Sequence, residues 1–530
     1  MKEASTHYQW KTSSWTPRAK KHAGAKPSAA AADVEGQSAD TPAATLGEME
    51  LASKAKATQD QLLMLALPHH MDVFAGKPQV EEGLAGKFKC IKGAMTPIIG
   101  TTWQMQDKLP GIEWHSTAGA DLDELLTADI LEQARLDVKS VPPVAPDPYA
   151  FGKALGRLAR IALITDQLGD KETSKEAADA LGPYLAPWLD GENPDALLYD
   201  TAWGGVVSKR GLEDEMEDFG NGWYNDHHFH YGYFIYGAAV AIKYDPSFYT
   251  QYRRQLELLV ADIANTQTNS DLFPFARHKD MYDFHSWASG LFPQSNGKSQ
   301  ESISEAINAY YAVHLYGVAT KNDALRDWGR VLAQMELRAG HTYWQMPSGT
   351  PIYDSNFASN KMAGVVGALD VICNTWFGDK FEYIHAINMM PFTPITEALL
   401  RPPFVAEEYP VLARALAHAI NFHLTLARAL AHGDGVAQEW LGFVYMDQAI
   451  VDPNQSWADL LSLRIFDSGN SLTNGLYWSA TRPKHDIAFA KAPAASSNGA
   501  KCSANAACAA HALVGECCPT SQGVMLNCCS

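Results

Sequence analysis

The sequence predicts a mainly α-helical protein whose helices pair into an (α/α) barrel. Stretches with apolar residues at helical spacing recur between residues 149 and 432. Long loops rich in Gly, Trp, Asn and Asp separate many of these stretches. The regular alternation of strands and helices that a doubly wound sheet needs is absent from the sequence. Together, these three observations favour a helical barrel over an α/β sheet.

The N-terminal part of the chain predicts strands. Residues 7–12 are strand-like, and residues 16–59, rich in Ala, Lys, Ser and Pro, have the composition of a disordered insert. The apolar run 62–67 predicts a buried strand, and residues 88–103 predict a strand and turn pair. We therefore expect residues 1–60 to hold a partial strand and an insert, and residues 61–112 to form a mixed, strand-containing region.

Helices are predicted over residues 149–168, 174–189, 246–265, 302–317, 322–337, 358–375 and 410–432. The stretch 246–265 is the clearest, because it opens with Asp-Pro and then repeats apolar residues on one face. We assign residues 113–485 to the barrel, residues 486–500 to a linker and residues 501–530 to a cysteine-rich module.

Composition limits the classes of partner. The chain has 530 residues, which suits one large helical barrel with appendages, and 46% of them are apolar, enough for a large core. The net charge of −18 argues against nucleic acid and anionic membranes as partners and fits a neutral ligand. No apolar run reaches the roughly 18 to 20 residues of a membrane span. The N-terminus shows no signal peptide.

Cysteines point to an oxidising compartment. Cys90 and Cys373 are isolated, whereas six further cysteines crowd the last thirty residues. Such density predicts a disulfide knot, for which six cysteines allow 15 pairings. The knot conflicts with the absence of a signal peptide, so we expect an extracellular or cell-wall protein whose N-terminal portion is incomplete.

The stretch 218–240, DFGNGWYNDHHFHYGYFIYGAAV, is the densest in ionisable and aromatic side chains. Asp226 lies at its centre and has three interpretations: a helix N-cap, one half of a buried Asp–His pair, or a general acid. For the third, aromatic packing and a neighbouring carboxylate would raise the pKa of Asp226 and keep it protonated near neutral pH.

A second dense segment, residues 285–312, carries Glu301 and Glu305. Four residues apart on a helix, two side chains share a face. Ser302 and Glu305 also fit a capping box, which would give Glu305 a structural role that can coexist with a functional one. Glu301 stands just before the helix in a Gly/Asn/Ser loop, where a catalytic base could project into a cleft. Carboxylates set against aromatic rings are what cleavage of a sugar chain requires.

Other chemistries have weaker support. His227, His228 and His230 invite a metal site, but no partnering motif with zinc-ligand spacing occurs, and we expect these histidines to bind sugar hydroxyls or position carboxylates. We therefore expect no metal and no cofactor. Neither a phosphate-binding glycine loop nor the G-x-S-x-G motif of serine hydrolases is present. Three tryptophans beside Gly and polar residues fit a cleft wall better than a core: Trp203, Trp223 and Trp287.

Several motifs, in order, resemble those of glycoside hydrolase family 81, the endo-β-1,3-glucanases. They are LALPHH (65–70), YDTAWGG (199–205), DFGNGWYNDHHFHYGYFIY (218–236), HSWASGLF (285–292), QESISEAINAYY (300–311), YIHAINMMPFTPIT (383–396) and GNSLTNGLYWSATRP (469–483). The resemblance covers about residues 61–485, and its long N-D-H-H and Q-E-S-x-S-E strings make it specific.

The resemblance implies an (α/α)6 barrel catalytic domain preceded by a β-sandwich and a small linking region. It also implies hydrolysis of internal β-1,3-glucosidic bonds with inversion. Asp226 would be the general acid, Glu301 the general base and Glu305 a supporting carboxylate. For contact with the glucan we predict Trp203, Trp223, Tyr224, His228, His230, Tyr231, His285 and Trp287. We expect a monomer that binds β-1,3-glucan and neither nucleic acid nor membrane.

Two departures from the family pattern leave alternatives open. Most of the β-sandwich is missing, with residues 8–14 resembling a late strand of it, and the cysteine-rich tail lies outside the family core. The alternative to an enzyme is a non-catalytic β-glucan-binding protein or an inactive, truncated remnant. A metal-dependent hydrolase that uses the histidine cluster is a third interpretation. Intact Asp226, Glu301 and Glu305 favour the enzyme, because a pure binder needs no such set.

Overall fold

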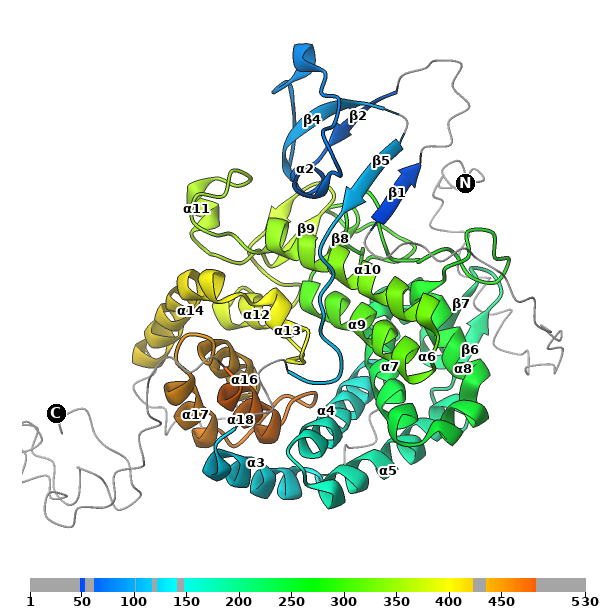
Figure 1. Cartoon of the computed structure of the whole chain (residues 1–530), viewed down its shortest axis with the longest axis vertical. Helices are drawn as coiled ribbons and strands as arrows, with labels where there is room; N and C mark the ends of the chain where they lie inside the picture. Colours follow the sequence, from blue (N-terminus) through cyan, green and yellow to red (C-terminus); the bar gives the residue numbers. More distant parts are fainter. Residues whose placement is uncertain are drawn as a thin grey trace, which may run out of the picture. The chain divides into compact units, whose positions relative to one another are not determined.

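The structure is a computed structural model that describes residues 48–52, 62–100, 102–116, 122–140, 147–422 and 435–482. Within these residues the protein is mainly helical, with a small β region before the helices (Figure 1). None of the helices in this part of the chain combines the length and the apolar character needed to cross a membrane. The strand at 7–12, the linker and the cysteine-rich module lie outside the described residues and stay predictions.

The small β region contains two antiparallel sheets. One has three strands in the order β2-β4-β3, and the other pairs β1 with β5. A short helix, α2, follows β2. The elements are β1 (Glu48–Ala52), β2 (Leu63–Ala66), α2 (Pro68–Val73), β3 (Phe88–Cys90), β4 (Gly93–Ile99) and β5 (Thr102–Gln106). The strands expected within 62–67 and 88–103 are therefore confirmed.

The expected disordered insert, residues 16–59, is wrong at β1. The segment Glu48–Ala52 forms a strand, because its sequence EMELA alternates polar and apolar residues at the period of a strand. The Ala- and Pro-rich composition of the surrounding residues hid this short pattern. The rest of the insert lies outside the described residues.

The helices follow in order around the molecule (Figure 1). The longer ones are α3 (Glu124–Asp137), α4 (Pro148–Gln167), α5 (Lys171–Leu189), α7 (His227–Tyr244), α8 (Pro246–Ala264), α9 (Ile303–Ala319), α10 (Asp323–Ala339), α14 (Pro402–Phe422), α16 (Gly435–Gln448), α17 (Pro453–Ser462) and α18 (Leu472–Ala480). The shorter elements are β6 (Leu197–Asp200), β7 (Gly205–Ser208), α6 (Lys209–Glu213), β8 (Ser299–Gln300), α11 (Ser355–Ala358), β9 (Val365–Gly367), β10 (Val371–Ile372), α12 (Phe381–Ala386) and α13 (Thr396–Leu399).

Side-chain caps explain where the predicted helices begin. Asp147 accepts a hydrogen bond from the N–H of Ala150 at the start of α4, and Asp245 accepts one from Ser247 at the start of α8. Asn322 caps α10 in the same way. Each cap satisfies a backbone donor that the first turn would leave without a partner. The helices expected at 149–168, 174–189, 246–265, 302–317 and 322–337 are confirmed within a few residues.

Two helix predictions need correction. Residues 358–375 do not form the expected helix. Instead, β9 pairs with both β8 and β10, because β-branched residues between Gly364 and Gly367 build a strand whose apolar spacing imitated a helix. The helix expected from residue 410 begins earlier, at Pro402, and Pro410 lies inside α14. Proline is over-represented in the first turn of helices, but here it is tolerated inside one. Residues 423–432 lie outside the described residues.

The core of the helical region is built on α4, α7 and α9. Nearly every residue of α7 and α9 is buried, whereas α8 and α10 bury one face. Helices α7 and α9 pack closely at Gly232, where a Cβ atom would lie only 2.7 Å from the Cβ of Ala309. This close approach brings the N-terminal ends of both helices, with their carboxylates, into one neighbourhood.

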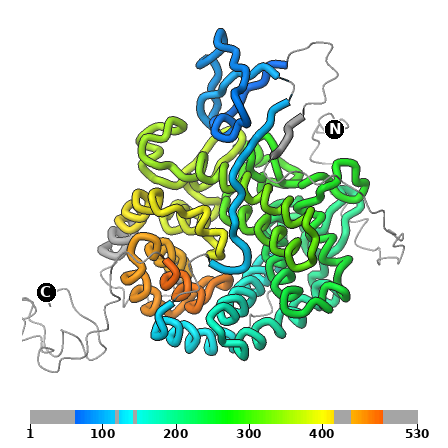
Figure 2. Tube along the Cα trace, viewed as in Figure 1, coloured from blue at the N-terminus to red at the C-terminus, as the bar shows by residue number. Residues whose placement is uncertain are grey.

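A linking segment joins the β region to the helices. Residues 107–116 descend from β5 along α9 and α10, as Figure 2 shows. Arg338 of α10 donates to both carboxylate oxygens of Asp107, at 3.0 and 2.8 Å. The hydroxyl of Tyr311 in α9 donates to the carbonyl of Glu113. The β region is thus fixed to α9, one of the two helices whose ends carry the carboxylates, and to its neighbour α10.

Candidate active site

Asp226 is the residue before α7 and occupies its N-cap position without capping it. Its backbone is left-handed, with φ 62° and ψ 8°, and its side chain does not cap the described first turn. The N–H of Asp226 donates to the carbonyl of Ala288 at 3.0 Å, and the N–H of Leu291 donates to the carbonyl of Trp223 at 2.8 Å. The loop is therefore fixed through its backbone, which leaves the carboxyl group available for other chemistry.

The loop before Asp226 is strained. The residues with φ in the left-handed region between 218 and 226 are Asp218, Phe219, Gly220, Tyr224 and Asp226. Such conformations cost free energy for non-glycine residues and cluster at functional sites. The neighbouring Gly290 has no room for a side chain, because a Cβ atom would lie 2.1 Å from the carbonyl oxygen of Trp223. Tight backbone packing thus holds Asp226 in place.

Glu301 lies between β8 and α9, at the edge of the small sheet formed with β9. Its carboxylate Oε1 accepts a hydrogen bond from the N–H of Trp376 at 2.7 Å. Its carbonyl oxygen accepts one from the indole Nε1 of Trp344 at 3.0 Å. The residue is only 6% exposed. Both its backbone and its side chain are therefore positioned by groups from distant parts of the chain.

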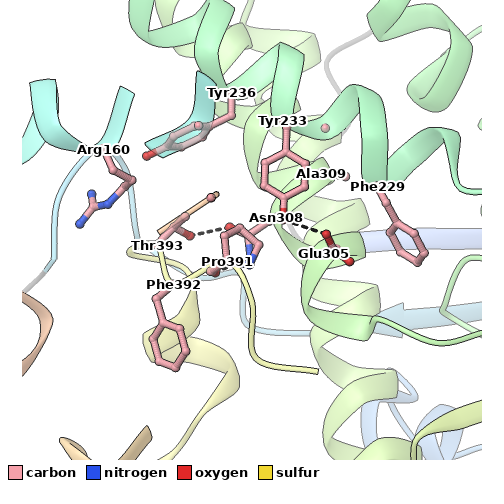
Figure 3. A pocket seen from close by; sticks show the side chains of 13 residues that line it. Arg160, Phe229, Tyr233, Tyr236, Glu305, Asn308, Ala309, Pro391, Phe392 and Thr393 are labelled. Atoms are coloured by element: carbon pink, nitrogen blue, oxygen red, sulfur yellow. Dashed lines mark hydrogen bonds between the residues drawn. The ribbon is translucent and has the colours of Figure 1, made fainter. Parts of the chain in front are cut away.

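Glu305 lies in the first turn of α9, and one half of the expected capping box is present. Ser302 accepts a hydrogen bond from the N–H of Glu305 at 3.3 Å. The carboxylate of Glu305 accepts hydrogen bonds from the hydroxyls of Tyr149 at 2.9 Å and Tyr233 at 2.8 Å. Figure 3 shows the Tyr233 contact. The capping contact of the Glu305 backbone therefore leaves its carboxylate available to the two tyrosines.

The three carboxyl groups influence each other's protonation. Burial raises the pKa of Asp226 well above its usual value, and the charges of Glu301 and Glu305 raise it further. Burial raises the pKa of Glu301 to about 8, the N–H of Trp376 opposes this increase, and Glu305 adds to it. Burial also raises the pKa of Glu305, against the charge of Lys153 and its tyrosine hydrogen bonds. The structure thus brings the three predicted catalytic residues together.

Hydrogen bonding distinguishes Asp226 from Glu301. Among the described residues, no group donates a hydrogen bond to the buried Oδ1 of Asp226. The carboxylate of Glu301 receives the N–H of Trp376, which favours its ionised form. When the two carboxyl groups share a single proton, these hydrogen bonds favour a protonated Asp226 and an ionised Glu301. A protonated carboxyl group and a nearby carboxylate are an acid and a base.

A small pocket adjoins Glu305. Helices α4, α7 and α9 contribute most of its lining, together with residues 391–393 (Figure 3). The hydroxyl of Thr393 donates to the side-chain oxygen of Asn308 at 2.5 Å on its wall. Glu305 lines the pocket but Asp226 and Glu301 do not. The pocket is therefore a chamber next to the carboxylate group rather than the whole site.

Three of the eight residues predicted to contact sugar lie at or near the surface. Trp203 is exposed, and Trp223 and Trp287 are half-buried. The indole N–H of Trp287 donates to Asp280 at 3.1 Å. His230 is buried and stacks on Tyr149, which places it one side chain away from Glu305.

The other four lie in the core: Tyr224, His228, Tyr231 and His285. Each of them makes at least one hydrogen bond to a protein group. The hydroxyl of Tyr224 donates to Asp200 at 2.9 Å, that of Tyr231 donates to the carbonyl of Val206 at 2.8 Å, and His228 pairs with Gln300 at 2.9 Å. Direct sugar contact by these four side chains stays a prediction that their burial does not favour.

One group in the described residues could offer metal ligands. Atoms of His227, Asp262 and His278 lie within 4.8 Å of one another. However, His227 contacts Asp262 through Nδ1 at 2.7 Å and the carbonyl of Asn221 through Nε2 at 2.9 Å. Both partners are oxygen acceptors, so both ring nitrogens of His227 serve as donors in this arrangement. The set is built as a hydrogen-bonded ion pair, a poor fit for a metal that would need one of these nitrogens.

Sequence reasoning missed several residues at the site. Tyr149 contacts Glu305, Trp344 and Trp376 contact Glu301, and the exposed Phe219 packs edge-to-face against Tyr149. Tyr149 and Trp376 lie outside the quoted motifs, and no local pattern identifies them. The positive φ of Phe219 is equally invisible in the sequence, although its Asp-Phe-Gly-Asn-Gly context is typical of a turn.

Comparisons with known proteins agree with this geometry. Residues 120–480 match the family described as "Glycosyl hydrolase family 81 C-terminal domain", and residues 21–116 match the one described as "Glycosyl hydrolase family 81 N-terminal domain". The chain is similar to a glucan endo-1,3-beta-D-glucosidase of Glycine max, with 33% identity over 81% of this chain and 63% of that protein. It is also similar to the primary septum glucan endo-1,3-beta-D-glucosidase of Schizosaccharomyces pombe, with 31% identity over 76% of this chain and 39% of that protein.

A solved structure of a glycoside hydrolase family 81 protein from Clostridium thermocellum superposes with a TM-score of 0.66 and 28% identity. It covers 82% of this chain, and this chain covers 58% of it. The chain thus spans less than two thirds of the length of these relatives. Because the C-terminal family description matches more than half of the 530 residues, the chain belongs to glycosyl hydrolase family 81.

Proposed function

We propose that this chain is a glucan endo-1,3-β-D-glucosidase that hydrolyses internal β-1,3 bonds with inversion of configuration. The observation that carries the proposal is the unequal environment of two buried carboxyl groups, Asp226 and Glu301: the charge of Glu301 raises the pKa of Asp226, whereas the N–H of Trp376 favours the ionised form of Glu301. The family relatives, which are named for this activity, support the choice of substrate. The helical region is proposed to close into an (α/α)6 barrel.

The mechanism divides the chemistry between two residues. Asp226 protonates the leaving glycosidic oxygen, and Glu301 removes a proton from a water that attacks the anomeric carbon from the opposite face. Inversion requires room for that water, so the carboxyl groups should be about 6.5–9.5 Å apart when substrate is bound. Trp376 supports the role of Glu301, because its N–H stabilises the carboxylate that accepts the proton.

Glu305 tunes this pair and takes no proton from the reacting groups. Tyr149 and Tyr233 donate to its carboxylate and favour its charged form. A negative charge there raises the pKa of Asp226 and keeps the acid protonated. This arrangement needs neither a metal nor an organic cofactor.

Exposed aromatic rings provide surfaces for a neutral glucan. Phe219 is 59% exposed on the side of Tyr149, while Trp376 and Phe377 are 40% and 51% exposed next to Glu301. Exposed apolar side chains beside a buried polar site are typical of ligand-binding grooves. We propose that these rings hold the sugar faces on either side of the scissile bond.

The proposed location is extracellular or in the cell wall, where β-1,3-glucan occurs as a polymer. The six crowded cysteines of the tail support it, because such density is typical of proteins from oxidising compartments. The acidic net charge fits an uncharged polysaccharide as partner and a protein that acts as a monomer.

Release of reducing sugar from a soluble β-1,3-glucan tests the proposal. The chain is compared with Asp226→Asn and Glu301→Gln, and with Asp129→Asn and Glu132→Gln, matched changes at exposed positions of α3. We expect oligosaccharide release by the unaltered chain and both controls, and losses of at least roughly a hundredfold in the two site variants. If the folded chain binds glucan but releases no sugar, the enzyme proposal is wrong and the chain is a glucan-binding protein.

A further inference from the structure

A lysine of the β region is buried among residues of the helical region. Lys92 lies in the turn between β3 and β4 and is 4% exposed. Its ammonium group donates to Asp283 at 2.9 Å and to Nε2 of His285 at 2.8 Å, and it lies 4.9 Å from the ring centre of Trp287. Burying an ammonium group costs free energy that an apolar side chain would not, so its retention calls for an explanation beyond packing.

His285 lies between this ammonium group and a tryptophan and contacts both. A lysine can only donate, so Nε2 of His285 is an acceptor, and Nδ1–H donates to the carbonyl of Ser286 at 2.8 Å. The imidazole is therefore neutral, with one tautomer and one orientation. Its ring meets Trp344 edge-to-face, with ring centres 5.1 Å apart.

Trp344 connects this contact to Glu301. It is fully buried at the end of a π-helical turn, Gly340–Trp344, that follows α10. Its indole N–H donates to the carbonyl oxygen of Glu301 at 3.0 Å. Single π-helical turns are rare and are frequently found at functional sites.

The β region contacts the same turn at a second point. The Nε2 of His69, in α2, faces the carbonyl of Tyr282 at 3.1 Å and must donate to it. Its Nδ1 is therefore the acceptor for the hydroxyl of Tyr343, 2.6 Å away. Tyr343 and Trp344 are adjacent, so contacts from α2 and from the β3–β4 turn converge on the residues that hold Glu301.

We propose that Lys92 is a positioning residue for the general base, fixing the backbone of Glu301 through His285 and Trp344. This inference rests on the proposed function of Glu301 as base. Without the ammonium group of Lys92, His285 loses the hydrogen-bond partner that fixes its ring. The proposal therefore makes the small β region part of the active site. The role of His285 is then support of the base and not contact with sugar.

The first test compares steady-state kinetics of the unaltered chain, Lys92→Met and Lys89→Met on a soluble β-1,3-glucan. Lys89 lies on the same hairpin and is exposed, so its variant is a matched control. Misplacement of a catalytic group lowers the rate of chemistry without weakening substrate binding. We expect kcat to fall roughly 10- to 100-fold in Lys92→Met, with KM within about twofold, and no change in the control. An unchanged kcat in folded Lys92→Met overturns the proposal.

The second test asks whether the effect passes through Glu301. In a Glu301→Ala background, added azide attacks the anomeric carbon without a base, the glycosidic bond breaks, and the leaving oxygen takes the proton of Asp226. Because the base is absent, Lys92→Met should change this azide-dependent rate by less than about twofold. An equal loss in both backgrounds would assign Lys92 to general structure and reject the positioning role.

A third readout does not depend on activity. Hydrogen exchange should be faster at residues 299–302 and 340–346 in Lys92→Met, but not in Lys89→Met. Trp344→Phe, which removes the indole N–H and leaves Lys92 intact, should speed exchange at 299–302 in the same way. If the unaltered chain proves inactive, the proposed function fails, and hydrogen exchange alone tests whether Lys92 fixes the backbone of Glu301. Unchanged exchange in both Lys92→Met and Trp344→Phe overturns that link.

Discussion

Because Glu301 is buried, we expect Glu301→Gln to be more stable than the unaltered protein by an amount that grows as the pH rises. The glutamine of Glu301→Gln can still accept the N–H of Trp376 through its amide oxygen, so the main structural contact is kept. The change removes only a carboxyl group whose pKa is raised from 4.5 to about 8. Between these values the folded state binds more protons than the unfolded state, so the wild-type contribution to stability is lost as the pH rises.

The size of the effect follows from the two pKa values. A difference of one in pKa corresponds to about 1.36 kcal/mol. Ionisation of Glu301 in the unfolded state lowers the free energy of unfolding. Relative to low pH, where the group is protonated in both states, the loss is about 0.8 kcal/mol at pH 5 and about 3.4 kcal/mol at pH 7. The advantage of Glu301→Gln should therefore grow by roughly 2.5 kcal/mol over this interval.

Urea unfolding followed by tryptophan fluorescence at pH 5, 6 and 7 measures this difference. Any constant effect of the substitution cancels, because only its change with pH matters. Glu132→Gln, at an exposed position of α3, should show no such change. A stability difference for Glu301→Gln that stays flat between pH 5 and 7 would refute the claim that burial raises the pKa of Glu301.

Three further predictions concern the site. Glu305→Gln removes a negative charge that raises the pKa of Asp226, so the high-pH limb of kcat/KM should move to lower pH, and an unmoved limb would contradict the tuning role. Gly290→Ala forces a Cβ against the carbonyl of Trp223, so it should destabilise the protein by about 1–3 kcal/mol in urea unfolding and lower activity, unlike Gly111→Ala, where the added Cβ meets nothing within 4 Å and φ is not positive. Prolonged treatment with a chelator should leave glucan hydrolysis unchanged, and a loss restored by added metal would revive the metal-dependent interpretation.

The grouping of the carboxyl residues was predictable because they lie in dense motifs, whereas their roles stay predictions. Asp226 and Glu301 stand in strings of aromatic and polar residues, and the structure brings them together with Glu305 through the close packing of α7 on α9. Their partners were not predictable. Tyr149 and Trp376 reach the site through long-range packing, and each is separated by dozens of residues from the carboxylate it contacts.

Helix prediction succeeded where caps and periodicity agreed and failed where short strands imitated a helix. The stretch 246–265 has an Asp-Pro start and one apolar face, and it forms α8. Residues 358–375 have apolar residues at similar spacing, but their pairing partner β8 lies more than sixty residues away along the chain. Strand pairing of this kind depends on distant residues, which local periodicity does not contain.

The anomeric configuration of the first product tests the central claim most directly. Proton NMR of a β-1,3-gluco-oligosaccharide during cleavage distinguishes the α-anomer from the β-anomer before they equilibrate. If Asp226 protonates the leaving oxygen while Glu301 activates water on the opposite face, the α-anomer must appear first. First appearance of the β-anomer, or no cleavage by the folded chain, would contradict the account.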